Sequence, residues 1–147
     1  MRNFAFRLEK LLEIRGYREK KKILELAEVT GRYMQIINSI HDLKTRKRTI
    51  MESRFISSGN NVYAIMSDQS LISAIEKKIS DLEEKLVPIN IEKENKRLEY
   101  VEALKSKRVI EKLKEKKAYA HKREELLRET RVLDDIVNSN FKKVQEV

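Results

Sequence analysis

The chain of 147 residues has no cysteine and no tryptophan, only one proline and only three glycines. Without cysteine it can form no disulfide, no thiolate metal site and no cysteine nucleophile. Glycine and proline are the strongest local breakers of helices, so few positions force a helix to end. No uninterrupted apolar run approaches the roughly 18 residues that a transmembrane helix needs, and the first residues lack the apolar core of a signal peptide. We therefore expect a cytosolic protein without a membrane span.

Charged residues make up 39% of the chain and apolar residues 40%, while aromatic residues are 6% and the mean hydropathy is -0.62. This balance is typical of a coiled coil, since disordered chains have far fewer regularly placed Leu, Ile and Val residues. The net charge is +9. The positive field of such a chain could attract nucleic acid, anionic lipid or an acidic protein. Alternatively, the positive charge could belong only to the solvated outer faces of long helices.

One cluster of turn-forming residues, Ser57-Ser58-Gly59-Asn60-Asn61, separates two stretches in which apolar residues recur every three or four positions. That period indicates a helix with one buried stripe. The sequence predicts an all-α fold, a long antiparallel two-helix coiled-coil hairpin in a single domain. Its parts are expected as follows: the domain over 1–147, the first arm over about 4–56, the turn over about 57–66, the second arm over about 67–138 and a frayed tail over 139–147.

Each arm carries a heptad-like seam. The first seam comprises Leu26, Val29, Tyr33, Ile36, Ile40, Leu43, Lys47 and Ile50. The second comprises Ile72, Ile75, Ile79, Leu82, Leu86 and Ile89, continued by Tyr100, Leu104, Val109, Leu113, Ala120, Leu127, Leu133 and Val137. We expect Ser67 or Asp68 to cap the second arm and Pro88 to kink it, because proline removes a backbone hydrogen bond and clashes with the preceding turn. Around Gly16 the first arm has few apolar residues, and we expect a loosened stretch there.

Residues that carry chemistry are sparse. The two histidines, His41 and His121, have no second soft ligand at metal spacing, and no two glycines lie close enough to build a phosphate-binding loop. Neighbouring acidic residues such as Glu83 and Glu84 diverge around a helix, and a two-helix protein has no cleft in which they could act together. We therefore expect no enzyme activity and no catalytic, cofactor-binding or metal site.

Four stretches of the sequence share their pattern with a known family: the opening Phe4-x-Phe6-Arg7-Leu8-Glu9-Lys10-Leu11-Leu12-x-x-Arg15, Glu25-Leu26-Ala27, Leu71-Ile72-x-x-Ile75-Glu76-x-x-Ile79, and the stretch from Ala103 to Leu133-Asp134-Asp135. In these stretches the chain resembles the flagellar export protein FliJ family. The resemblance implies a stalk or chaperone component of the bacterial flagellar type III export apparatus, similar to the central stalk of rotary ATPases. The implied partners are the hexameric export ATPase, the cytoplasmic domain of the membrane export gate protein and export chaperones. The implied location is the cytoplasmic side of the inner membrane at the flagellar base.

Two groups of residues are candidates for these contacts. For the gate, near the turn, the candidates are Phe55, Leu71, Ile72 and Ile75. For the ATPase, at the open end, they are Phe4, Phe6, Arg7, Leu8, Leu11, Leu12 and Arg15, with Leu127 to Val137 beside them. The alternative for both groups is that the apolar residues only hold the two arms together.

Other functions are also compatible with this sequence. The chain could be a central stalk subunit of a rotary ATPase, or a coiled coil that dimerises into a four-helix bundle. It could also bind nucleic acid or an anionic surface, which predicts a steep loss of binding with added salt. Specific nucleic-acid binding is not expected, since the basic runs lack stacking aromatic residues apart from Tyr119.

Overall fold

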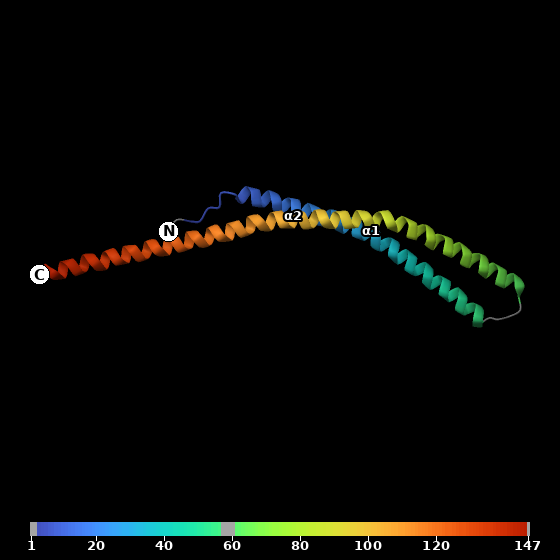
Figure 1. The fold of residues 1–147 in the computed structure, drawn as a ribbon. Coiled ribbons are helices and arrows are strands. Elements are labelled where there is room, and N and C mark those ends of the chain that lie inside the picture. The colour runs from blue at the N-terminus through green and yellow to red at the C-terminus, as the bar shows by residue number, and fades with distance from the viewer. Residues whose placement is uncertain (1–2, 57–60, 147) are drawn as a thin grey trace. The chain divides into compact units, whose positions relative to one another are not determined.

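A computed structural model describes residues 3–56 and 61–146, with the side chains of residues 55 and 56 left out. Two helices make up nearly all of this part of the chain: α1 spans Glu9–Ile56 and α2 spans Val62–Gln145 (Figure 1). No strand occurs in the described ranges. The predicted all-α hairpin of two long helices is confirmed. The chain divides into two compact units, which we name the turn unit, residues 20–102, and the terminal unit, residues 1–19 and 103–147.

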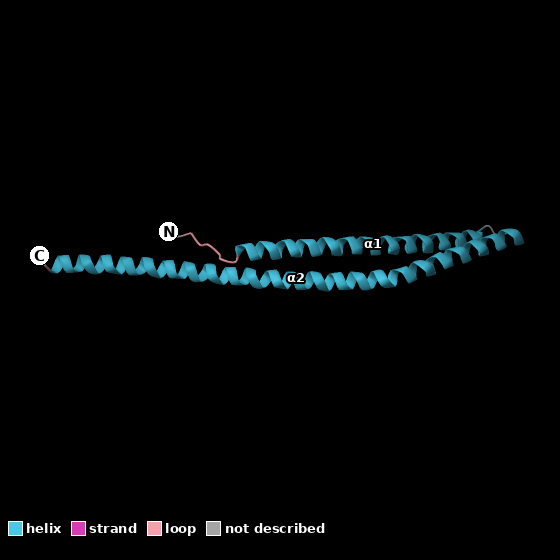
Figure 2. Ribbon diagram, turned by 90° about the horizontal axis from the view of Figure 1, so that it is seen from above, coloured by secondary structure: helices cyan, strands magenta, loops and turns pink. Residues whose placement is uncertain are grey.

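In the turn unit, α1 and α2 lie side by side and run in opposite directions (Figure 2). Ion pairs between the two helices establish that the helices run in opposite directions. As the residue number of the α1 member rises from one pair to the next, that of the α2 member falls. These pairs are Lys22–Glu99 at 3.0 Å, Arg32–Glu92 at 2.9 Å and Lys47–Glu76 at 2.8 Å. The helices are therefore antiparallel from one end of the turn unit to the other.

The core of the turn unit is a narrow apolar seam. Ile40, Ile75 and Ile79 are buried together, and the half-buried side chains packed on them are Ile36, Leu43, Ile50, Leu82 and Leu86. Every residue predicted for the first seam, and for the second as far as Ile89, is buried or half-buried. Burying one such aliphatic side chain contributes about 2 kcal/mol, so a handful of isoleucines supplies much of the stability of this unit.

In the terminal unit, the start of α1 packs on the middle of α2. Glu9 lies 2.8 Å from Lys114, and the ring of Phe4 lies against His121 with centroids 5.6 Å apart. Ala103 and Ile110 are the buried apolar residues here. The helix α1 begins where the backbone N–H of Glu9 donates to the carbonyl oxygen of Phe6 at 3.2 Å.

Beyond Ile89 the seam of α2 agrees only in part with the predicted one: Tyr100, Leu104 and Leu113 are half-buried as predicted, and the other predicted residues are not. Val109, predicted inside, is 63% exposed, and Ala120 is exposed as well. Leu127, Leu133 and Val137 are also more than half exposed. The actual seam of the terminal unit follows the heptad positions Ala103, Lys107, Ile110 and Lys114. Lysine can occupy such positions because its aliphatic stem covers apolar surface while its ammonium group reaches outward.

The start of α2 also lies elsewhere than expected. The helix begins at Val62 rather than near Ser67 or Asp68, because Asn61 acts as its cap: the Asn61 side-chain oxygen accepts a hydrogen bond from the backbone N–H of Tyr63 at 3.2 Å. Residues 57–60 of the predicted turn lie outside the described part of the chain.

Both helices continue through positions where interruptions were expected. α1 is helical through Gly16, and α2 is helical through Pro88 and on to Gln145, across most of the stretch expected to fray. A kink at Pro88 remains a prediction.

Candidate partner-binding surfaces

A closed layer of four charged side chains lies between α1 and α2 in the turn unit. Lys22 contacts Glu25 at 3.3 Å and Glu99 at 3.0 Å, and Lys96 contacts the same two carboxylates at 3.2 Å and 3.4 Å. Each ammonium group thus bridges the two glutamates, one from each helix. We name Lys22, Glu25, Lys96 and Glu99 the charged layer.

Mutual contact shifts the pKa of every member of the charged layer toward its charged form. Hydrogen bonds from Lys96 and then Lys22 lower the pKa of Glu25, and the hydrogen bond from Lys22 lowers the pKa of Glu99. The hydrogen bond to Glu99 raises the pKa of Lys22, and the hydrogen bond to Glu25 raises the pKa of Lys96. Because these charges are matched inside the chain, the layer acts in pairing the helices rather than in holding a ligand.

Further seam lysines of α2 find partners on α1. In the turn unit, the ammonium group of Lys93 lies 4.0 Å from the centre of the Tyr33 ring, a cation–π contact. In the terminal unit, Lys107 lies 3.4 Å from Glu19. In each unit, a basic residue of the α2 seam meets an acidic or aromatic residue of α1, which favours one register over its neighbours.

The structure separates the four residues predicted to bind the gate. Ile72 and Ile75 are buried, with 2% and 4% exposure, and Ile75 belongs to the core. Leu71 is 47% exposed. Phe55 lies in the last turn of α1, and its side chain is outside the described part. A partner that docks on the intact hairpin can therefore touch Leu71 but not the two isoleucines.

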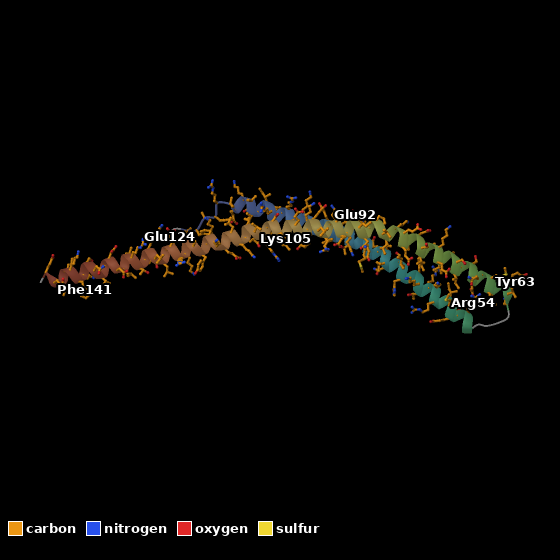
Figure 3. The ribbon with its side chains drawn as sticks, viewed as in Figure 1. Arg54, Tyr63, Glu92, Lys105, Glu124 and Phe141 are labelled. Carbon is orange, nitrogen blue, oxygen red and sulfur yellow. The ribbon has the colours of Figure 1, made fainter. Side chains whose placement is uncertain are left out.

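Exposed apolar side chains also cover the first turns of α2, where the sequence was assigned to the turn. They are Val62, Tyr63, Ile65 and Met66, with exposures of 63%, 86%, 42% and 65%. Tyr63 and Arg54 mark this region in Figure 3, and an Arg54 guanidinium N–H donates to the carbonyl oxygen of Ile65 at 3.3 Å. The four-residue spacing of Val62 and Met66 was the feature of the sequence that could have indicated a helix here. We name Val62, Tyr63, Met66 and Leu71 the turn-end surface.

At the start of the chain, most of the residues predicted for the ATPase contact pack inward. The half-buried members are Phe4, Phe6, Leu8, Leu11, Leu12 and Arg15, whereas Arg7 is exposed. Arg15 donates a hydrogen bond from Nη1 to the carbonyl oxygen of Ser106 at 2.9 Å. These residues therefore hold α1 on α2 in the terminal unit.

The outward side of α1 in the terminal unit carries apolar residues that were not among the predicted contact residues. Ile14 is 63% exposed and Tyr17 is 75% exposed. They lie three positions apart and so share one face of the helix. Arg7 lies before the first residue of α1 and is exposed as well. We name Arg7, Ile14 and Tyr17 the open-end surface. The spacing of Ile14 and Tyr17 is visible in the sequence, but only the register between α1 and α2 shows that these side chains point away from α2.

Comparison with known families gives one match. The family model described as "Flagellar FliJ protein" matches residues 4–146, nearly the whole chain. The chain belongs to the FliJ family. FliJ proteins are non-catalytic components of the flagellar export apparatus. No curated protein and no solved structure matches the chain.

In this FliJ-family chain the last part of α2 has no helix packed on it. Every residue from Leu126 to Glu146 is exposed, and Figure 3 shows the side chains around Phe141 standing free of any other ribbon. The sequence had placed several of these residues in a seam with the first arm. They are instead available to another molecule.

The described parts of this FliJ-family chain hold no group of three or more His, Asp or Glu side chains that could bind a metal ion. Of the two histidines, His41 is exposed and His121 contacts Phe4. Within the same residues, neither helix combines the length and the apolar character required to cross a membrane.

Proposed function

We propose that this FliJ-family chain is a non-enzymatic stalk and chaperone component of the flagellar type III export apparatus. It binds the hexameric export ATPase and the cytoplasmic domain of the membrane export gate protein, and it also contacts export chaperones. It works on the cytoplasmic side of the inner membrane at the flagellar base. The observation that carries this proposal is the family match over residues 4–146, because the family is a component of flagellar export.

The gate contact is assigned to the turn-end surface. Tyr63 and Met66 expose most of their apolar area, and Leu71 exposes about half of its own. Exposed aromatic and methionine side chains of this kind are enriched at protein interfaces. The buried Ile72 and Ile75 support the surface from beneath by holding α2 on α1.

The ATPase contact is assigned to the open-end surface. Ile14 and Tyr17 offer apolar contact area, and the exposed Arg7 adds positive charge to a chain with a net charge of +9. An acidic partner would be attracted by this field, and the charge would raise the association rate more than the affinity. The remaining predicted residues, among them Phe4 and Arg15, shape this surface by anchoring α1.

Binding of the purified gate domain tests the assignment near the turn. Leu71→Ala together with Met66→Ala should weaken binding at least about tenfold, roughly the loss of 1.4 kcal/mol, with the helical circular dichroism unchanged. Leu98→Ala is the matched control, because Leu98 is 53% exposed on α2 but lies away from the turn. Equal affinity of the wild type and the double variant for the gate domain would remove the turn-end surface from the proposal.

A further inference from the structure

The exposed end of α2 carries a continuous set of large apolar side chains. They are Leu126, Leu127, Leu133, Ile136, Val137, Phe141 and Val144, with exposures of 59%, 52%, 62%, 50%, 54%, 68% and 76%. We name these seven residues the tail stripe. Isolated exposed apolar residues are ordinary on a protein surface, but a contiguous group of this size marks an interaction site.

The spacing of the tail stripe is that of a coiled-coil seam. Leu126 and Leu133 are separated by one heptad, and so are Val137 and Val144. The second pair is offset from the first by four positions, as positions a and d of a heptad are. The remaining members flank this seam at positions e and g. The pattern fits the side of another helix rather than a globular pocket.

The tail stripe faces away from the side of α2 that packs on α1. Successive residues of a helix are about 100° apart, which puts Leu126 and Val137 on the side opposite the buried Ile110. Tyr119 shares the side of the stripe and is 71% exposed, while Ala118 next to it is half-buried. A helix covering the stripe can therefore approach without displacing α1.

We propose that the tail stripe pairs with the tail stripe of a second copy of this chain, as an antiparallel coiled coil. One register brings all seven apolar residues into contact across a two-fold axis. In this register Leu133 lies opposite Val137 of the second copy, Leu126 opposite its Val144, Leu127 opposite its Phe141, and Ile136 opposite its own counterpart.

The polar residues between them complement one another in the same register. Glu129 lies opposite Lys143 of the second copy, which gives two symmetry-related ion pairs, and Thr130 lies opposite Asn140. A polar pair within an apolar seam selects one register over its neighbours. The one unfavourable contact is that between the two copies of Asp134. A parallel arrangement would instead set Glu129 beside Asp134 of the second copy, and like charges at such positions oppose pairing.

Sedimentation equilibrium of the full chain tests this pairing without any export partner, so that its outcome is independent of the proposed function. The mass should rise from 17.5 kDa toward twice that value as the concentration rises. Glu129→Lys and Lys143→Glu should each weaken dimerisation about tenfold, or ~1.4 kcal/mol. The double variant should restore it, because the charges match again in reversed order. Asp134→Asn should tighten the dimer by removing the like-charge contact.

Asp135→Lys is the matched control, since it makes the same charge change as Glu129→Lys on the side of α2 away from the stripe, and it should leave the mass distribution unchanged. A mass of 17.5 kDa at every concentration up to about a millimolar, where association is worth only about 4 kcal/mol, would overturn the proposal. So would a dimer that responds equally to Glu129→Lys and Asp135→Lys, since another surface would then hold it.

The direction of pairing has its own test, since the chain has no natural cysteine. A short bis-maleimide should link Ile136→Cys to itself across the two-fold axis. It should fail to link Leu126→Cys to itself, but should link Leu126→Cys to Val144→Cys in a mixture. Efficient self-linking of Leu126→Cys would contradict the antiparallel arrangement.

Discussion

Lys22 on α1 and Glu99 on α2 lie 3.0 Å apart, and the same two side chains share their charges with Glu25 and Lys96. Two lysines and two glutamates thus take the place of apolar residues in the seam of the turn unit. Any other register would separate the two pairs that join the helices, Lys22–Glu99 and Lys96–Glu25, and would leave only the pairs within each helix. The charged layer therefore specifies how the helices align, at a position where isoleucine would allow them to slide.

The charged layer should make stability depend on pH. The contacts lower the pKa of Glu25 and Glu99 below the usual 4.5, so their contribution is complete above that value and is lost as pH falls through the lowered pKa. They raise the pKa of Lys22 and Lys96 above 10.5, so that contribution is complete below 10.5 and is lost as pH rises further. We expect the difference in urea midpoint between the wild type and Glu25→Gln/Glu99→Gln to be largest between these limits.

The same variant should lose part of its disadvantage at high salt, because salt screens partly exposed charges. Glu94→Gln is the control, since Glu94 pairs with Arg97 on its own helix and does not join the two helices. A constant difference in midpoint from pH 3 to pH 9 would show that the layer contributes by packing and not by charge.

Ile75 and Leu71 should separate stability from binding. Ile75 is 4% exposed in the core and Leu71 is 47% exposed, so Ile75→Ala should lower the free energy of unfolding by about 3 kcal/mol and Leu71→Ala by less than about 0.5 kcal/mol. Urea unfolding followed by circular dichroism measures both. Similar losses for the two variants would mean that α2 does not present these residues on different sides.

Arg15 should contribute to the terminal unit through one hydrogen bond. Its Nη1 donates to the backbone carbonyl oxygen of Ser106, and removal of such a bond costs about 1 kcal/mol. Arg15→Ala should therefore lower the unfolding free energy by about that amount. Arg18→Ala, at an exposed position of the same helix, removes an equal charge. The prediction fails if both variants unfold at the same urea concentration.

Gly31→Ala should stabilise the chain. Gly31 lies inside α1, and an added Cβ atom would meet no other heavy atom within 4 Å. Alanine is favoured over glycine in a helix interior by about 1 kcal/mol, so the thermal midpoint should rise. A lower midpoint would indicate that the outer face of α1 at this position is covered by another molecule, such as a second copy.

The sequence predicted the helices and the apolar seams because isoleucine and leucine at heptad spacing leave little choice of face. Beyond Ile89 it predicted Tyr100, Leu104 and Leu113 correctly. It missed Lys107 and Lys114, which occupy seam positions, and it wrongly placed Val109 inside. In the sequence alone, a lysine at a seam position indicates an interruption of the apolar stripe, because its glutamate partner on the other helix is not known. The same ambiguity affected the predicted contact residues. Leu71 and Ile72 are neighbours in the sequence, and only the register of the two helices shows which of them is exposed and which is buried. The capping role of Asn61 was hidden inside the predicted turn, and with it the apolar residues that follow.

We expect this chain to act on the flagellar export ATPase through the terminal unit. Mixing the purified protein with that ATPase, and measuring hydrolysis together with ring formation by electron microscopy, tests this expectation most directly. We predict faster hydrolysis and more hexameric rings with the wild type, and neither effect with Ile14→Asp, a variant of the open-end surface whose helical fold is checked by circular dichroism. Unchanged hydrolysis by an active ATPase across a range of salt concentrations would contradict this expectation.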